Sequence, residues 1–207
     1  CFPDVYEVGM SHLGSRILYH VLNQRKDTYC ERVYAPWPDM EKLMRENNIP
    51  LYALETKDPI NEFNFLAFTL QYEMSYTNIL NMLNMGGIPL RASERTEKDP
   101  LVIAGGPCAY NPEPLYDIVD IFQLGEGEEG LNDLLDLYQK HKDNFNKEAY
   151  LREASHIPSV YIPSLYDVTY NEDGTIKEFI PKYDDVPKKV KKRIINNFDQ
   201  VDFPESL

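Results

Sequence analysis

Three short, almost uninterrupted apolar runs constrain the fold of this chain more than any other feature. They cover residues 65–70, 101–104 and 118–124. A strand buried on both faces of a parallel sheet reads as a near-continuous apolar run, whereas a half-exposed strand alternates apolar and polar residues. The runs therefore predict a parallel sheet with helices covering both of its faces.

Helical patterns alternate with these runs. One helix is predicted between the first two runs and another after the third, because apolar residues recur there at helical spacing. The residues concerned are Ile79, Leu80 and Leu83, and then Leu131, Leu134, Leu135 and Tyr138. An earlier stripe, from Leu13 to Leu22, predicts a helix for which Ser11 is a candidate cap. This alternation predicts an α/β fold of the Rossmann or flavodoxin type, with the carboxyl ends of the strands on one edge.

The pattern changes after about residue 142, which divides the chain into an α/β domain at 1–142 and a smaller part at 143–207. In the second part, residues 171–174 (Asn-Glu-Asp-Gly) separate two β-prone stretches and predict a hairpin. A basic run at 188–193 then stands out in an acidic protein. We interpret it as a solvated linker.

Charge and composition exclude several classes of protein. The formal net charge of −13 repels polyanions and argues against a nucleic-acid partner. No stretch approaches the roughly 20 apolar residues of a membrane-spanning helix, and three scattered cysteines form neither a disulfide framework nor a metal-binding pair. We therefore expect a soluble, cytoplasmic domain. Because the first residue is Cys1, we also expect it to be part of a longer polypeptide.

Two loops that follow the apolar runs have unusual composition. Ligands of open parallel sheets bind beyond the carboxyl ends of the strands, so these loops are candidate binding sites. The first offers the hydroxyl and amide groups of Thr69, Gln71 and Ser75, although Ser75 or Thr77 as a helix cap explains it equally well. The second, at residues 105–107 (Gly-Gly-Pro), would let a ligand approach the backbone, and a tight turn is the alternative.

A third loop, at residues 125–130, matches the dinucleotide pattern G-x-G-x-x-G after a strand and before a helix. Its acidic residues Glu126, Glu128 and Glu129 would oppose a pyrophosphate at the start of that helix. A nucleotide-binding enzyme is therefore the weakest of the functions considered. The four histidines are scattered, and Cys108 is better explained as a small packed residue than as a nucleophile. We predict no catalytic residue and no metal site.

Four stretches taken together resemble the amino-terminal part of cobalamin-binding-type radical SAM proteins. They are residues 2–14, 71–78, 105–107 and 124–129, and their order and spacing match as well. The resemblance covers the chain from Cys1 to about Lys142. It implies a Rossmann-like domain whose strand-end loops face cobalamin. The cofactor-binding residues it implies are His12, Gly14, Thr69, Gln71, Ser75, Gly105, Gly106, Pro107, Gly125, Glu126 and Gly127.

The sequence departs from the family pattern in two ways. Cobalamin domains with a histidine ligand carry Asp-x-His-x-x-Gly after the first strand, but here Met10 replaces the aspartate and the glycine is misplaced, so His12 is not predicted as a metal ligand. The family's first strand would lie before Cys1, so most of it is truncated. The C-x-x-x-C-x-x-C cluster motif is also absent. A 4Fe-4S cluster and S-adenosylmethionine would therefore bind only in the full-length parent, through its radical SAM domain.

These observations lead to a main hypothesis and one alternative from another class. The main hypothesis is an accessory cobalamin-binding-type domain of a radical SAM enzyme, non-catalytic in isolation, whose partner is the radical SAM domain of the same polypeptide. The alternative is a cofactor-free interaction or structural domain with the same fold. Large side chains that fill the space above the strand ends would favour the alternative. The oligomeric state is left open.

Overall fold

The structure is a computed structural model that describes residues 1–197 and residue 204. Its main sheet has four strands in the order β1-β2-β3-β4. Their bounds are β1 (Phe65–Thr69), β2 (Leu101–Gly105), β3 (Ile121–Gln123) and β4 (Val160–Tyr161). The first three run parallel, and β4 pairs antiparallel with β3. The three apolar runs thus form adjacent parallel strands, as predicted.

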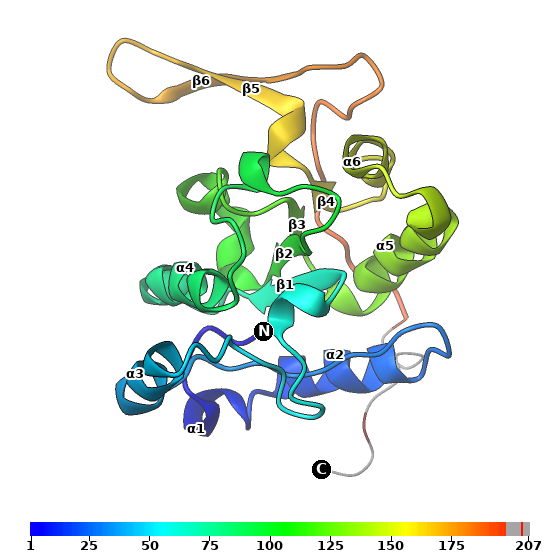
Figure 1. Ribbon diagram of the computed structural model, residues 1–207. Coiled ribbons are helices and arrows are strands. Elements are labelled where there is room, and N and C mark those ends of the chain that lie inside the picture. Colours follow the sequence, from blue (N-terminus) through cyan, green and yellow to red (C-terminus); the bar gives the residue numbers. More distant parts are fainter. Residues whose placement is uncertain (198–203, 205–207) are drawn as a thin grey trace.

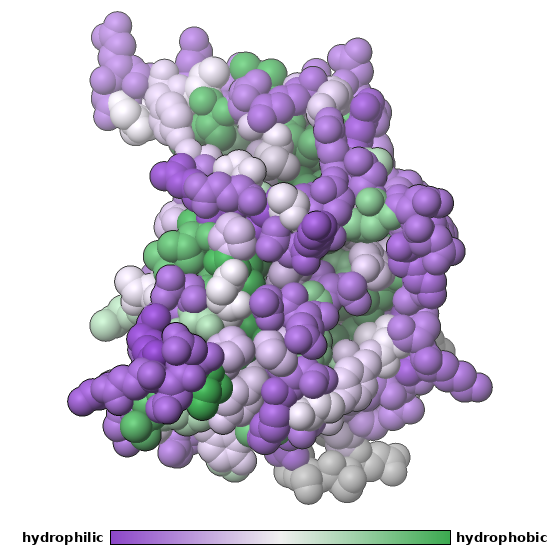
Figure 2. All heavy atoms as spheres, in the orientation of Figure 1, coloured by the Kyte–Doolittle hydropathy of each residue, from purple (hydrophilic) through white to green (hydrophobic). Residues whose placement is uncertain are grey.

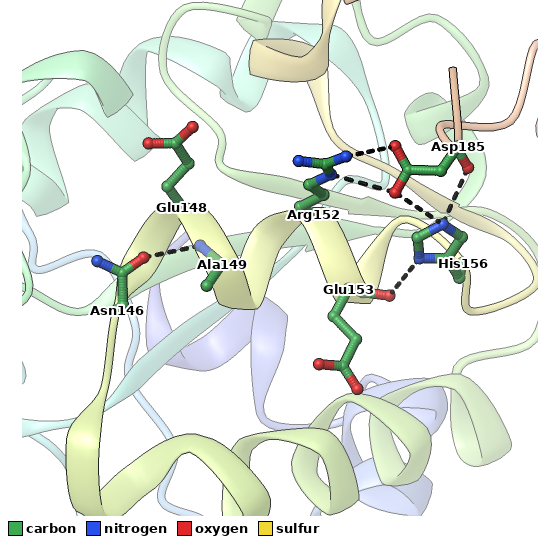
Figure 3. A pocket seen from close by; sticks show the side chains of 7 residues that line it. All are labelled: Asn146, Glu148, Ala149, Arg152, Glu153, His156 and Asp185. Carbon is green, nitrogen blue, oxygen red and sulfur yellow. Dashed lines mark hydrogen bonds and ion pairs between the residues drawn. The ribbon is translucent and has the colours of Figure 1, made fainter. Parts of the chain in front are cut away.

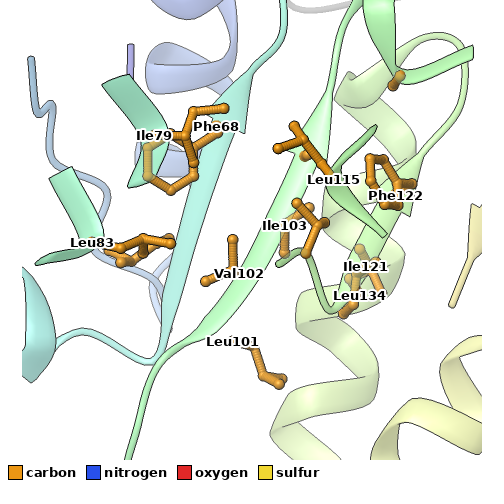
Figure 4. Packing of buried hydrophobic residues seen from close by; sticks show 14 of the residues in the cluster. Phe68, Ile79, Leu83, Leu101, Val102, Ile103, Leu115, Ile121, Phe122 and Leu134 are labelled. Atoms are coloured by element: carbon orange, nitrogen blue, oxygen red, sulfur yellow. The ribbon is translucent and has the colours of Figure 1, made fainter. Parts of the chain in front are cut away.

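Helices cover both faces of this sheet, which confirms the predicted layers (Figure 1). The helices are α1 (Tyr6–Gly9), α2 (Leu13–Asn23), α3 (Pro38–Glu46), α4 (Tyr76–Met85), α5 (Gly127–His141) and α6 (Lys147–Ala154). Figure 4 shows Ile79 and Leu83 of α4 on one side of the strands and Leu134 of α5 on the other. All three side chains are buried in the hydrophobic core. The strands are apolar throughout because each face meets a helix.

The amino-terminal residues form part of the sheet edge beside β1. The amino group of Cys1 donates to the carbonyl of Ala67 at 2.6 Å, and the amide of Phe2 donates to the carbonyl of Val33 at 2.8 Å. Phe2 also forms a parallel bridge with Tyr34. Cys1 and Phe2 therefore occupy the place expected for the carboxyl end of the first strand. With them counted, the order of segments is flavodoxin-like, and the order reverses between Phe2 and β1.

A buried charge network, which the sequence patterns did not reveal, lies at the amino ends of β2 and β3, away from the candidate binding loops. Asp120 immediately precedes β3, and its carboxylate accepts from Arg95 at 2.9 Å, from Lys147 at 2.9 Å and from the amide of Val102 at 2.9 Å. The side chains of Arg95 and Asp120 are each 1% exposed. Arg95 also donates to the backbone carbonyls of Pro89 and Leu90. These bonds tie the loop before β2 and the start of α6 to the sheet.

The predicted hairpin is present as β5 (Tyr166–Tyr170) paired antiparallel with β6 (Ile176–Pro181). It extends from the rest of the molecule at the top of Figure 1. Before it, α6 packs against α5, and β4 extends the main sheet. The division of the chain at residue 142 stays a prediction.

The basic run at 188–193 differs from the solvated linker that we expected. Val190 packs against the hydrophobic core, and the side chain of Arg193 is only 13% exposed. The backbone of Arg193 forms a parallel bridge with Gly125. Ile195, two residues further on, is also buried. The four lysines of the run are exposed, as a solvated segment requires, but the linker interpretation was wrong for Arg193, which finds acidic partners on α5. Residues 198–203 and 205–207 of the expected linker lie outside the described residues.

In the part of the chain that the structure describes, no helix has the length and apolar character needed to cross a lipid bilayer.

Candidate functional site

The loops after β1 and β2 lie against each other. The amide of Leu70 donates to the carbonyl of Gly105 at 2.6 Å, and the amide of Cys108 donates to the carbonyl of Leu70 at 3.1 Å. Within the first loop, the side-chain amide of Gln71 donates to the hydroxyl of Thr69. The structure therefore brings together predicted residues from two loops, and their polar groups bond mainly to each other.

Gly106 is required by this contact between loops. Its φ of +101° is rarely adopted by other residues, and a Cβ at this position would lie 2.9 Å from the carbonyl oxygen of Leu70. The glycine thus allows a close approach of the chain's own backbone, where the sequence analysis considered a ligand. Pro107 follows it at the surface and begins a short 3-10 helix. These residues therefore form a tight turn, which was the alternative to a ligand-binding loop.

Gly125 also allows a close approach of the chain's own backbone, and the approach is closer than at Gly106. Its φ is +92°, and a Cβ would lie 2.2 Å from the carbonyl oxygen of Arg193. The amide of Arg193 donates to the carbonyl of Leu124 at 2.8 Å. We call residues 190–195 the strap. The strap therefore covers the third candidate loop at Gly125. A Cβ added to Gly127, at the start of α5, would lie 3.5 Å from the side chain of Leu18 in α2.

The acidic start of α5 binds the side chain of the strap. The guanidinium of Arg193 pairs with Glu129 at 3.2 Å and forms a second, shorter ion pair with Asp133. The carboxylates that argue against a pyrophosphate at this helix thus have a cation of the same chain as their partner. These carboxylates therefore bind a cation, whereas a G-x-G-x-x-G loop in dinucleotide enzymes binds an anion.

Three buried polar atoms around this loop have no hydrogen-bond partner among the described residues: Gln123 Oε1, Glu126 Oε2 and Arg193 Nε. Gln123 itself is buried, and its Nε2 donates to the hydroxyl of Ser159 at 2.7 Å. Gly130 leaves the space for this amide, because a Cβ there would lie 2.3 Å from Gln123 Nε2. The sequence analysis missed the roles of Gln123 and Arg193; the one available signal was a glutamine inside an apolar run.

His12 has a structural role at the start of α2. Its Nδ1 accepts from the backbone amide of Ser15 at 3.1 Å and lies 2.9 Å from the hydroxyl of Ser15. Ser11 was therefore the wrong choice of cap, because the imidazole one residue later reaches the free amide of the first turn. The ring of His12 also packs against Phe2, with centroids 5.1 Å apart. Gly14 lies within the first turn and faces this ring.

The crevice expected at the point where strand order reverses is bridged by side chains. The hydroxyl of Tyr72, in the loop after β1, donates to the carboxylate of Asp4, which follows Phe2. Asn78 of α4 donates to the carbonyl of Pro3 at 2.9 Å. Ser75 occupies the N-cap position of α4, but its hydroxyl donates to the carbonyl of Tyr72 and makes no cap hydrogen bond. The two loops are thus held to each other.

Cys108 lies beside these loops. Burial, followed by the nearby carboxylate of Glu73, raises the pKa of its thiol above the ordinary value, which keeps the thiol protonated at neutral pH. This environment suits a packed residue better than a nucleophile. Among the described residues, no group of three or more His, Cys, Asp or Glu side chains is placed to hold a metal ion.

An open hollow lies elsewhere, on α6 (Figure 3). Arg152 forms a two-bond ion pair with Asp185, at 2.8 and 3.1 Å, and His156 Nε2 lies 2.9 Å from the carbonyl of Asp185. None of the predicted cofactor-binding residues lines it. Its charged groups bond to each other and attach the segment after β6 to α6.

Comparison of the sequence with known protein families gives a match. The sequence profile described as "Radical SAM proteins, N-terminal" matches residues 14–163. The chain belongs to this family. This confirms the radical SAM part of the resemblance found in the sequence.

The chain is also similar to "Uncharacterized protein MJ0966" of Methanocaldococcus jannaschii, with 26% identity over 128 residues. The matched stretch covers 61% of this chain and 23% of the relative. The chain thus spans less than a quarter of that relative's length. No solved structure matches the chain.

Proposed function

We propose that these residues form a cofactor-free accessory domain of a radical SAM protein, with a strand-end rim that is closed by the chain itself. The observation that carries the proposal is the pairing of the strap with Gly125, where a Cβ would lie 2.2 Å from Arg193. On this proposal, the glycine-rich loops pack against backbone segments of the same chain and do not bind a cofactor.

Cobalamin, which the resemblance implies, does not fit this rim as it stands. The strap covers the loop at Gly125, the loops after β1 and β2 bond to each other, and Tyr72 links to Asp4 across the crevice. His12 uses its Nδ1 to cap α2. A large planar cofactor would have to displace several of these contacts, most of which satisfy polar backbone groups. Cobalamin binding is therefore the second candidate.

The chemistry of the parent protein belongs, on this proposal, to the sequence beyond this chain. A 4Fe-4S cluster needs cysteine thiolates, and S-adenosylmethionine binds at that cluster in radical SAM proteins. The three cysteines here are far apart in sequence and none is placed in a metal-binding group among the described residues. The domain would support a neighbouring radical SAM domain of the same polypeptide.

Titration of the full-length polypeptide with cobalamin, followed by absorbance, tests the cofactor half of the proposal. We expect no saturable spectral change in the wild-type protein. Saturable binding near one equivalent would overturn the cofactor-free assignment. Arg193→Ala is the matched variant: binding that occurs only in this variant would show that the strap excludes the cofactor, and would support the closed rim.

Iron analysis and S-adenosylmethionine cleavage by the anaerobically reconstituted full-length polypeptide test the other half. We expect about four iron atoms per polypeptide, as in a 4Fe-4S cluster, and reductive cleavage of the sulfonium. A polypeptide that binds no cluster would contradict the radical SAM assignment, whatever the result with cobalamin.

A further inference from the structure

The hairpin of β5 and β6, residues 166–181, leaves apolar side chains uncovered on both of its faces. We call it the arm. Every residue from Ile176 to Ile180 is exposed, and the arm makes its dense contacts within itself. Figure 1 shows it extending from the rest of the molecule, and Figure 2 shows apolar atoms among hydrophilic ones at its surface.

The two faces of the arm follow from its register. Val168 lies opposite Phe179 and Tyr170 lies opposite Ile176, and these four side chains share one face because Val168 and Tyr170 are two residues apart in β5. Ile180 lies opposite Asp167 and next to Phe179 in β6, so its side chain points to the other face. A two-stranded hairpin alone is marginally stable in water, and its outer edges carry unpaired backbone groups. The arm therefore lacks cover on both faces and both edges within the described residues.

The root of the arm is firmly attached, so that the arm is held in a defined direction. Tyr166 is buried, its ring lies 5.3 Å from that of Tyr161, and its hydroxyl donates to the carbonyl of Pro187 at 2.6 Å. The amide of Lys182 donates to the carbonyl of Leu165 at 2.9 Å, which joins the two ends of the arm. A hairpin fixed at its base, with exposed apolar side chains along its strands, is suited to bind a surface.

We propose that the arm docks onto the radical SAM domain of the same polypeptide, an inference that rests on the proposed function. The family match ends at residue 163, just before the arm begins, and the matched stretch covers 23% of the curated relative. Most of that relative's length is thus available to provide a partner surface. Attachment within one polypeptide raises the effective concentration of such a surface to the millimolar range.

A second copy of this chain is a poorer partner for the arm. Each copy carries a formal net charge of −13, and the turn of the arm adds Glu172 and Asp173 at its tip. Two such surfaces repel each other at ordinary ionic strength. The charge argues against a second copy, and attachment within one polypeptide favours the radical SAM domain as the occupant.

Hydrogen exchange in the full-length polypeptide tests the docking. We expect amides of β6 to exchange at least tenfold more slowly in the wild type than in an Ile176→Ser/Ile180→Ser variant. Leu43→Ser on α3 is the control, because Leu43 is an even more exposed apolar residue that lies far from the arm in sequence, and we expect no change at β6. Fast exchange of β6 in the wild type would overturn the proposal.

Analytical ultracentrifugation of the same proteins distinguishes docking within one polypeptide from association of two copies. We expect a monomer whose β6 is protected at all concentrations. A dimer that the double substitution dissociates would overturn the proposal and assign the arm to a second copy. Protection of β6 in a polypeptide that binds cobalamin would keep the docking and refute only the cofactor-free function. Fast exchange of β6 in a polypeptide that passes the iron and S-adenosylmethionine assays would refute the docking alone.

Discussion

Strands β2 and β6 both come from clear β-patterns in the sequence, yet they have opposite surroundings. In β2, residues Leu101 to Ala104 are almost fully buried, with β1 and β3 on the two edges and helices over both faces. In β6, residues Ile176 to Ile180 are all exposed, and β5 is the single neighbour among the described residues. The comparison teaches that strand formation is a local property, whereas burial depends on which other segments are available.

The largest expected effect comes from the same substitution in the two regions. Phe122→Ala in β3 removes a fully buried ring and should lower the free energy of unfolding by about 3–5 kcal/mol. Phe179→Ala in β6, where the ring is 36% exposed, should cost less than about 1 kcal/mol in this chain. Denaturant unfolding of both variants measures the difference. Equal losses would mean that the arm is part of the cooperative core.

The buried charge network should be nearly as important as the apolar core. Asp120→Ala leaves Arg95 and Lys147 without their buried carboxylate and should cost about 3–5 kcal/mol. Asp117→Ala is the control, because this exposed carboxylate is 3.8 Å from Arg91 and should contribute less than about 1 kcal/mol. A small effect of Asp120→Ala in thermal or denaturant unfolding would contradict the importance of the network.

Replacement of Gly125 by alanine tests the strap. Both Gly125→Ala and Gly87→Ala force a side chain into a positive φ, at about 1–2 kcal/mol each. Gly87 has open space around it, whereas the new methyl group at Gly125 meets Arg193 and should cost about 1–3 kcal/mol more. Trypsin cleavage at the basic run should accelerate in Gly125→Ala alone. Identical cleavage rates in the two variants would show that the strap is not held by this contact.

The smallest effect on stability is expected from the loss of the Arg152–Asp185 ion pair at low pH. The guanidinium of Arg152 holds the pKa of Asp185 below its ordinary value, so the ion pair stabilises the folded chain above that value and is lost as the pH falls below it. The difference in Tm between wild type and Asp185→Asn should shrink as the pH falls from 5 to 3. A difference independent of pH would show that this ion pair does not contribute.

Much of the fold could be predicted from the sequence because its patterns are local and strong. The continuous apolar runs predicted β1, β2 and β3, and the turn at Asn171 to Gly174 predicted the hairpin. The cap of α2 was misassigned by one residue, since Ser11 and His12 offer acceptors at adjacent positions and the backbone path decides between them. The Asp120 network was not foreseen, because Arg95 and Lys147 are 25 and 27 residues away in sequence.

The candidate site was predicted less well than the fold. The loops after β1 and β2 do meet at the carboxyl ends of the strands, as the parallel topology requires. Whether Thr69, Gln71 or Gly105 contacts a cofactor stays a prediction. The strap could not be foreseen, because a basic run has the same composition whether it is solvated or paired with acidic side chains on a distant helix.

The sequence by itself determined the α/β class, the positions of the buried strands and the hairpin, because periodicity and turn residues act over a few neighbours. Only the tertiary structure decided what the glycines at 106 and 125 are for. A glycine in a loop allows close approach without naming what approaches, and here long-range folding brought Leu70 and Arg193 to those positions. The use of such a space depends on chain segments far apart in sequence, which no local pattern records.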